Sequence, residues 1–327
     1  MAKKIIILVL FAGSLFLNAC QKDIDVFVPD AGQLNGPDTT WQGTVSAAMP
    51  VAALKNNLLA EPYRDTINVN ANIASILTPF GLQVNFPPNC CTNGAGQLVT
   101  GKVDVEIQLA KKKGDMIRLD KPSSWNDSML ITAGQIFIQL KKAGQTLQFA
   151  PGVRINIRYI DLPTNPQMKF FIGDETNAQA FNWIPTPEPS LDTVIITPQS
   201  YQVYTKRLRW ISIAQPFEIN TGAKVNVVAD MASYFTNANT IAYTVFKDLH
   251  SVVAMRPNLG TRKFITGKLP IGKAITVVVI SKQGNDYYLG YESAVTQSSS
   301  SNPAIQQVHI VPIKKSLIQI LSFLHTL

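Results

Sequence analysis

The sequence is poor in charge and in the side chains that most often perform catalysis. Of its 327 residues only 15% are Asp, Glu, Lys or Arg, six are Glu and three are His. So little charge argues against a coiled coil or a disordered chain. The histidines His250, His309 and His325 do not stand in a His-Glu-x-x-His motif, and Gly-x-Ser-x-Gly and Gly-x-Gly-x-x-Gly are absent. Because a dispersed Ser-His-Asp triad needs no local motif, a hydrolase stays as our third functional hypothesis.

Carboxylates are too scattered along the chain to predict a metal or cofactor site. Asp104 and Glu106 alternate along one expected strand, and two carboxylates on one strand face are typical of a solvated surface. Asp115, Asp120 and Asp127 share one loop, but they lack the Asp-x-Asp-x-Asp-Gly spacing of a calcium loop. We therefore predict no metal and no cofactor.

Positive charge exceeds negative charge but is spread along the chain. Lys and Arg number 29 against 21 Asp and Glu, a formal net charge of +8. The one basic run, residues 111–113, precedes Gly114 and is typical of a strand end or turn. A nucleic-acid site would need a basic stripe with interleaved aromatic residues, so the sequence predicts no nucleic-acid partner.

The chain begins with a short basic and apolar leader. Lys3 and Lys4 precede an apolar run, residues 5–17, and the small residue Ala19 follows it. The run is shorter than the roughly 20 residues of a membrane-spanning helix. Its order of charge, apolar run and small residue is typical of a secretory signal. A transmembrane anchor and a soluble secreted protein with an incidental cysteine are the alternatives.

The residues around Cys20 resemble the lipobox of bacterial lipoproteins, with Leu17 three residues before the cysteine and Ala19 directly before it. The resemblance implies removal of residues 1–19, a thioether-linked diacylglycerol on Cys20 and acylation of the new amino terminus. Two or three acyl chains anchor a protein stably. Gln21, not Asp, follows Cys20, which in this family implies sorting to the outer membrane, on its periplasmic or its outward face.

The other two cysteines are adjacent, Cys90 and Cys91. A compartment outside the cytoplasm permits disulfides. A bond between neighbouring cysteines needs a strained ring, because their Cα atoms lie closer than disulfide geometry prefers. The pair is therefore a candidate disulfide, and the alternative is two small side chains at a turn.

Alternation of apolar and polar residues dominates the rest of the chain and predicts a mainly β fold. Residues 102–109 alternate strictly, and residues 67–71, 82–86, 136–140 and 153–159 repeat the pattern. Short strands at this spacing predict antiparallel β-sandwiches.

The spacing of strands, prolines and loops predicts the domain order. We expect a tether (20–45), a first antiparallel β-sandwich (46–162), a proline-rich connector with a bridging strand (163–220), a second β-sandwich (221–312) and a C-terminal helix (313–327).

Two helices are expected at the ends of this β-rich body. Residues 50–60 fit a short amphipathic helix with Pro50 in its first turn. Its apolar face would comprise Val51, Leu54, Leu58 and Leu59. Ser316 can cap the C-terminal helix. The face of that helix would comprise Leu317, Ile320, Leu321 and Leu324.

Residues 79–89, 101–107, 115–117, 133–138 and 144–147 resemble the ZU5-like lipoproteins of Bacteroidetes. The resemblance implies a ZU5-like β-sandwich, and most such lipoproteins have no assigned activity. Some ZU5 proteins cleave themselves at a His-Phe-Ser site, but the matching segment contains no histidine. Residues 268–272, a Leu-Pro-x-Gly element before an apolar strand, resemble transthyretin-like or carboxypeptidase-regulatory modules.

Aromatic residues in loops supply the remaining candidate site. Trp125 and Trp183 could stack on a sugar or a protein partner, and the alternative is that they anchor the core. We predict a membrane-anchored envelope lipoprotein, not an enzyme, with a structural or binding role. The alternative is a surface module that binds a glycan or an envelope protein through these aromatics.

Overall fold

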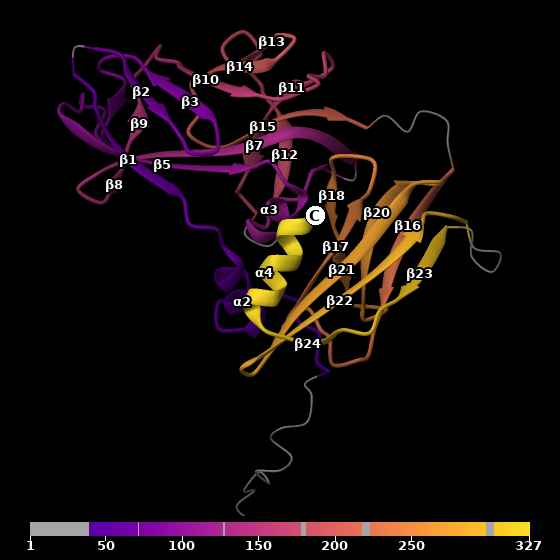
Figure 1. Cartoon of the computed structure of the whole chain (residues 1–327). Coiled ribbons are helices and arrows are strands. Elements are labelled where there is room, and N and C mark those ends of the chain that lie inside the picture. Colours follow the sequence, from indigo (N-terminus) through magenta and orange to yellow (C-terminus); the bar gives the residue numbers. More distant parts are fainter. Residues whose placement is uncertain (1–38, 71, 127, 178–180, 218–222, 299–303) are drawn as a thin grey trace, which may run out of the picture. The chain divides into compact units, whose positions relative to one another are not determined.

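In this computed structural model, the residues described are 39–327 except 71, 127, 178–180, 218–222 and 299–303 (Figure 1), and all belong to one compact unit, Thr39–Leu327. The expected signal peptide (1–19), Cys20 and the tether up to residue 38 lie outside the described residues. None of the helices within the described ranges has the length and hydrophobicity needed to cross a membrane. The described fold is mainly β, as the alternation predicts.

The first sandwich consists of two sheets in which all strand pairs are antiparallel. Its inner sheet contains, in spatial order, β1 (Tyr63–Asn68), β5 (Lys102–Ala110), β7 (Ser128–Lys142), β15 (Arg209–Pro216), β11 (Lys169–Asp174) and β12 (Asn182–Pro185), with β6 (Ser124–Trp125) and β8 (Gln145–Thr146) beside β7. Its outer sheet contains β13 (Thr193–Ile196), β14 (Ser200–Thr205), β10 (Ile155–Ile160), β3 (Leu82–Phe86) and β2 (Ala74–Leu77). A small ladder joins β4 (Cys91–Thr92) to β9 (Gln148–Phe149).

The described residues of the segment that we interpreted as a connector, 163–220, belong to this first sandwich. It supplies β11, β12 and β15 to the inner sheet and β13 and β14 to the outer sheet. The prolines misled the prediction because they stand at strand ends and in loops: Pro185 closes the edge strand β12 and Pro216 closes β15. The bridging strand we expected is β15, which pairs with both β7 and β11.

The second sandwich is smaller. Its inner sheet contains β18 (Val252–Ala254), β17 (Thr240–Phe246), β21 (Ala274–Gln283), β22 (Asp286–Val295) and β24 (Ile313–Lys315). Its outer sheet contains β19 (Arg256–Asn258), β20 (Lys263–Pro270), β16 (Lys224–Asp230) and β23 (Ile305–His309). The pair β16–β23 is parallel and departs from the antiparallel rule that we expected.

The described residues contain three helices, α2 (Pro50–Leu58), α3 (Lys113–Arg118) and α4 (Leu317–Thr326). Helix α2 buries Val51, Leu54 and Leu58 as predicted, but Leu59 lies past its end and is 49% exposed. Ser316 caps α4, as predicted, by accepting a hydrogen bond from the Gln319 amide at 3.2 Å. The basic run follows the end of β5 at Ala110, in line with the strand end that we expected, and helix α3 begins at its last residue, Lys113.

Three hydrophobic cores hold these layers together. One lies within each sandwich, and a third, the middle core, lies between the two inner sheets. All three helices contribute to the middle core, through residues such as Leu54, Met116 and Leu324 (Figure 1). Strands of both inner sheets are therefore buried on two faces; Phe246 of β17 faces the second sandwich's core and Tyr243 faces the middle core.

Candidate functional site

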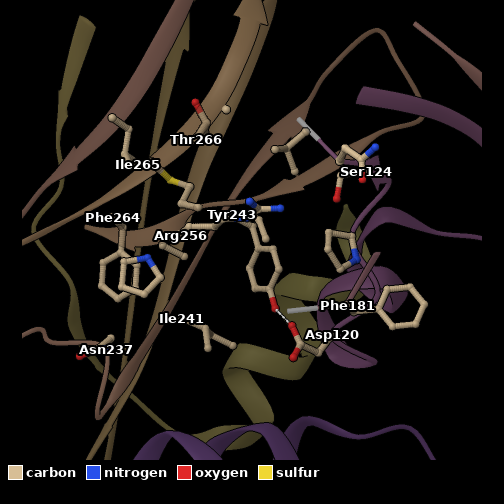
Figure 2. A pocket seen from close by; sticks show the side chains of 18 of the residues that line it. Asp120, Ser124, Phe181, Asn237, Ile241, Tyr243, Arg256, Phe264, Ile265 and Thr266 are labelled. Atoms are coloured by element: carbon tan, nitrogen blue, oxygen red, sulfur yellow. Dashed lines mark hydrogen bonds between the residues drawn. The ribbon is translucent and has the colours of Figure 1, made fainter. Parts of the chain in front are cut away.

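A groove of about 1510 Å³ lies among the described residues. Its walls come from the second sandwich, from the β6–β7 hairpin and from the segment that leads into α2. The chain passes from β18 to β19 along this groove. Figure 2 shows Phe264, Ile265 and Thr266 on the second sandwich, opposite Ser124, Phe181 and Asp120 of the first. The groove is larger than the roughly 300–1,000 Å³ of an ordinary small-molecule pocket.

Asp120 is tied to two distant segments at one end of the groove. Its carboxylate forms an ion pair with Lys55 of α2, Nζ–Oδ2 2.7 Å, and accepts a hydrogen bond from the Tyr243 hydroxyl at 2.5 Å (Figure 2). Burial acts to raise the pKa of Asp120, but the charge of Lys55 and the hydrogen bonds from Lys55 and Tyr243 outweigh it and lower this pKa below its ordinary value. The Asp120 carboxylate therefore stays ionised and is already bonded to Lys55 and Tyr243. A general acid must carry a proton, so Asp120 does not suit that role.

Lys121, the next residue, turns away from Asp120 onto aromatic rings. Its ammonium nitrogen lies 4.2 Å from the centre of the Phe181 ring and 5.4 Å from that of Trp210. Burial lowers the pKa of Lys121, with the charge of Asp120 opposing it. The Lys121 ammonium therefore packs on aromatic rings that belong to the middle core or contact it.

Trp125 lies on the β6–β7 hairpin and lines the groove, so the structure keeps it as a candidate binding aromatic. Its indole also lines a second hollow of about 440 Å³, and the ring packs edge-on against Phe171 at 6.0 Å. Ser124 and Ser128 flank it and also line the groove. The hairpin therefore presents one aromatic ring and two hydroxyls to the cavity.

Trp183, the second candidate binding aromatic, has no exposed surface among the described residues. Its side chain is fully buried in the middle core, and its indole N–H donates to the Pro122 carbonyl at 2.8 Å. The bond fixes the loop that begins the β6–β7 hairpin. Trp183 therefore supports the groove from behind, as the core-anchor alternative predicted.

The start of the described chain forms one wall of the groove. The Trp41 ring packs against Phe264 with centres 5.0 Å apart. The Gln42 amide donates to the Asn237 side chain at 2.9 Å, and Asn237 donates back to the Gln42 carbonyl at 2.7 Å. Residues 41–45, which we assigned to the tether, are thus docked on the second sandwich.

Among the described residues that line the groove, five are basic and one, Asp120, is a carboxylate. They are Lys55, Lys169, Lys224, Arg256 and Lys268. Lys55 is paired with Asp120. Lys169, Lys224 and Lys268 are exposed and form no ion pair with any described residue. The groove is therefore electropositive on both of its walls.

The three histidines lie elsewhere. His250 Nδ1 lies 2.5 Å from the Thr132 carbonyl. His309 pairs with Asp230 at 3.2 Å on an exposed surface, and the His325 ring lies 3.3 Å from Lys112 Nζ. No histidine is among the described residues that line the groove, so the carboxylate there has no imidazole partner of the kind that the hydrolase hypothesis requires.

Cys90 and Cys91 are free thiols, and both are fully buried in the first sandwich's core. The hydrogen bond between the two thiols, together with burial, raises the pKa of Cys90 far above its ordinary value. The same bond, helped by the charge of Lys142, lowers the pKa of Cys91 despite burial. The candidate disulfide is not formed in this structure.

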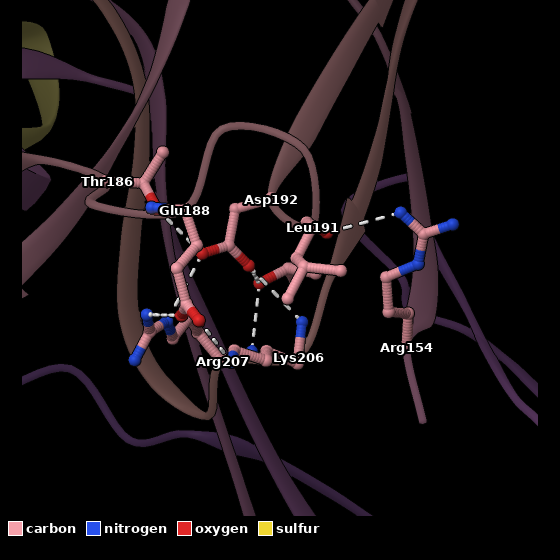
Figure 3. A network of polar contacts seen from close by, with 8 residues as sticks. Arg154, Thr186, Glu188, Leu191, Asp192, Lys206 and Arg207 are labelled. Carbon is pink, nitrogen blue, oxygen red and sulfur yellow. Dashed lines mark hydrogen bonds and ion pairs between the residues drawn. The ribbon is translucent and has the colours of Figure 1, made fainter. Parts of the chain in front are cut away.

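A second polar cluster lies in the first sandwich (Figure 3). Its centre is Asp192, whose side chain is fully buried. The carboxylate accepts hydrogen bonds from Thr186 and Thr205 hydroxyls at 2.7 and 2.8 Å and pairs with Arg207 at 3.2 Å. Glu188 pairs with Arg207 and with Lys206. These contacts hold the loop between β12 and β13, and Thr186 and Asp192 also line the hollow of about 440 Å³.

Neither metal chemistry nor known relatives point to a function. The described residues contain no group of three or more His, Cys, Asp or Glu that could hold a metal ion. No protein-family model matches the chain, and no curated protein sequence matches it. The groove and the leader are therefore the features of the chain that bear on its function.

Proposed function

We propose that this chain is a lipid-anchored protein of the bacterial cell envelope that binds a ligand in the groove and is not an enzyme. One observation supports the binding role above all: a groove of about 1510 Å³ is lined by aromatic and basic side chains, and the one carboxylate among its described lining residues, Asp120, is paired with Lys55. The resemblance of Leu17–Cys20 to a lipobox supports the anchor.

The anchor is tested by metabolic labelling with an alkyne analogue of palmitate in a bacterial host. We expect the full chain to take up the label, to fractionate with the outer membrane and to lose the label on Cys20→Ala. Label that persists in this variant, or a soluble wild-type chain, would contradict the anchor.

The binding role is tested with the full chain in detergent. Tryptophan fluorescence is followed while candidate oligosaccharides and peptides of the envelope are added. The ligand is then recovered, and its mass is measured by mass spectrometry. We expect saturable binding that weakens on Trp125→Ala, with an unchanged ligand mass. A recovered product with altered mass would show turnover and would favour the hydrolase hypothesis.

The alternative of a surface module that binds through loop aromatics is favoured by one further observation, the position of Trp125 on the groove. An aromatic face beside hydroxyl groups suits a sugar ring, whose C–H face stacks and whose hydroxyls bond at the edge. The two hypotheses thus converge on one site.

A further inference from the structure

We propose that the groove binds an acidic glycan, a carboxylated oligosaccharide whose acid groups pair with Lys169, Lys224 and Lys268 while one sugar ring stacks on Trp125. This inference rests on the proposed binding role and narrows it to one ligand class.

The charge of the groove argues for an anion. Lys224 and Lys268 stand on the neighbouring strands β16 and β20, in diagonal register, since Asn226 is opposite Lys268 and Lys224 is opposite Pro270. Diagonal neighbours on one sheet face lie about 7–8 Å apart, so their like charges repel unless an anion lies between them. Lys169, at the start of β11 in the other sandwich, also lines the groove.

The size of the groove argues for an oligomer. A volume of about 1510 Å³ exceeds that of most small-molecule sites. Basic residues on both walls would leave a single sugar acid in contact with one wall alone. A chain of several acid-bearing units can reach both walls and the hairpin at once.

The strand edges beside the groove argue against a peptide. An extended peptide binds most simply by adding a strand to a free edge. Edge strand β19 is three residues long and has Pro257, which has no N–H, at its centre. The neighbouring edge, β18, is already bonded to Ser123, whose amide donates to the Val252 carbonyl at 2.6 Å.

The hairpin supplies what a sugar ring needs. Trp125 offers an aromatic ring, and the Ser124 and Ser128 hydroxyls have no hydrogen-bond partner among the described residues. Such hydroxyls can donate to or accept from sugar hydroxyls. The aromatic ring and the lysines together fit a ligand that is at once a carbohydrate and an acid.

Calorimetric titration of the full chain in detergent tests the proposal. The probes are hexamers of galacturonic acid and of guluronic acid, a neutral hexamer of galactose, and hexaglutamate. We expect at least one hexauronate to bind about tenfold or more tightly than the neutral hexamer and hexaglutamate, and its affinity to fall about tenfold between low and high salt because salt screens exposed charges.

Charge-reversal variants locate the site. We expect Lys224→Glu with Lys268→Glu to lower the hexauronate affinity by about 30-fold or more. The matched control, Lys102→Glu with Lys247→Glu, changes two exposed lysines that do not line the groove and should keep the affinity within about twofold. Equal unfolding temperatures of the two variants confirm that folding is intact.

The remaining outcomes separate this inference from the binding role. Equal, Trp125-dependent binding of neutral and acidic hexamers would overturn the acidic ligand and leave the binding role in place. Tighter binding of hexaglutamate would replace the glycan with an acidic peptide. Failure of both hexauronates to bind would overturn the inference, and the fluorescence screen with Trp125→Ala would then decide the binding role on its own.

Discussion

The core of the first sandwich and the middle core are built in different ways. The first lies between two sheets and draws its buried residues from strands and the turns that join them, for example Val84 and Ile157. The middle core lies between two inner sheets and needs helices α2, α3 and α4 to fill it. Two sheets that pack face to face bury their apolar faces along their whole length. A helix between two sheets fills the space between them only at the place where it lies.

The difference explains where the groove can form. Residues at one margin of the middle core, Val51, Ile241 and Tyr243, also line the groove. The helices fill the rest of the gap, and the groove opens at this margin. In the first sandwich the buried Asp192 carboxylate is bonded by protein groups. The groove at the margin of the middle core instead carries lysines that form no ion pair with a described residue.

The largest effect should come from Gly114→Ala, which acts on the contact between α3 and α4. A Cβ atom at this position would lie 1.7 Å from the Leu324 carbonyl oxygen, a backbone atom that can move only if α4 moves. We expect a loss of about 3 kcal/mol or more in the free energy of unfolding, measured by chemical denaturation. Gly94→Ala, where a Cβ atom meets nothing within 4 Å, is the control and should be nearly neutral.

A smaller effect is expected from two matched deletions, Val84→Ala in the first sandwich's core and Val278→Ala in the middle core. Both side chains are fully buried. Each change should cost about 2 kcal/mol, from lost burial of two methyl groups and the cavity left behind. If the middle core joins the sandwiches into one cooperative unit, circular dichroism and tryptophan fluorescence will give the same midpoint in each variant. Two separate transitions would show that the sandwiches unfold independently.

The same contrast explains what the sequence could predict. Strict alternation marks strands with one polar face, so β5 and β10 were found from the pattern. Strand β21 lies between two cores, and most side chains of its run Ala274–Ile280 are apolar on both faces. A continuous apolar run of this kind indicates a strand that is buried on both faces. That signal was available, but the prediction of two separate sandwiches made no use of it.

The groove could be predicted only in part. The sequence places Trp125 and Asp120 in one loop. No local pattern shows that Asp120 contacts Lys55, 65 residues before it, and Tyr243, 123 residues after it. Trp183 looked like a loop aromatic because prolines surround it, while its burial depends on sheets formed by distant segments. Lys169, Lys224 and Lys268 are far apart in sequence and show no charge pattern.

Tyr243→Phe should have a moderate and pH-dependent effect on the middle core. It removes a hydrogen bond to the Asp120 carboxylate, which should cost about 1–2 kcal/mol at pH 7. The pKa of Asp120 is lowered in the folded protein. Its contribution to stability is therefore complete above the ordinary carboxyl pKa of about 3.9 and is lost as the pH falls through the lower folded value.

Denaturation of the wild type and Tyr243→Phe at several pH values tests this linkage. The difference in free energy of unfolding should shrink as the pH falls below about 4, because a protonated carboxyl accepts a weaker hydrogen bond. A difference that stays constant with pH would mean that Tyr243 stabilises the core through packing alone.

The smallest effect is expected at the end of α2. The amphipathic pattern assigned Leu59 to the buried face, but α2 ends at Leu58, and Leu59 is 49% exposed while Leu58 is fully buried. Leu59→Ala should therefore change the free energy of unfolding by less than about 0.5 kcal/mol. Leu58→Ala should cost about 2–5 kcal/mol. A loss above 1 kcal/mol for Leu59→Ala would mean that the helix continues to residue 60 in solution and that the middle core extends further along α2.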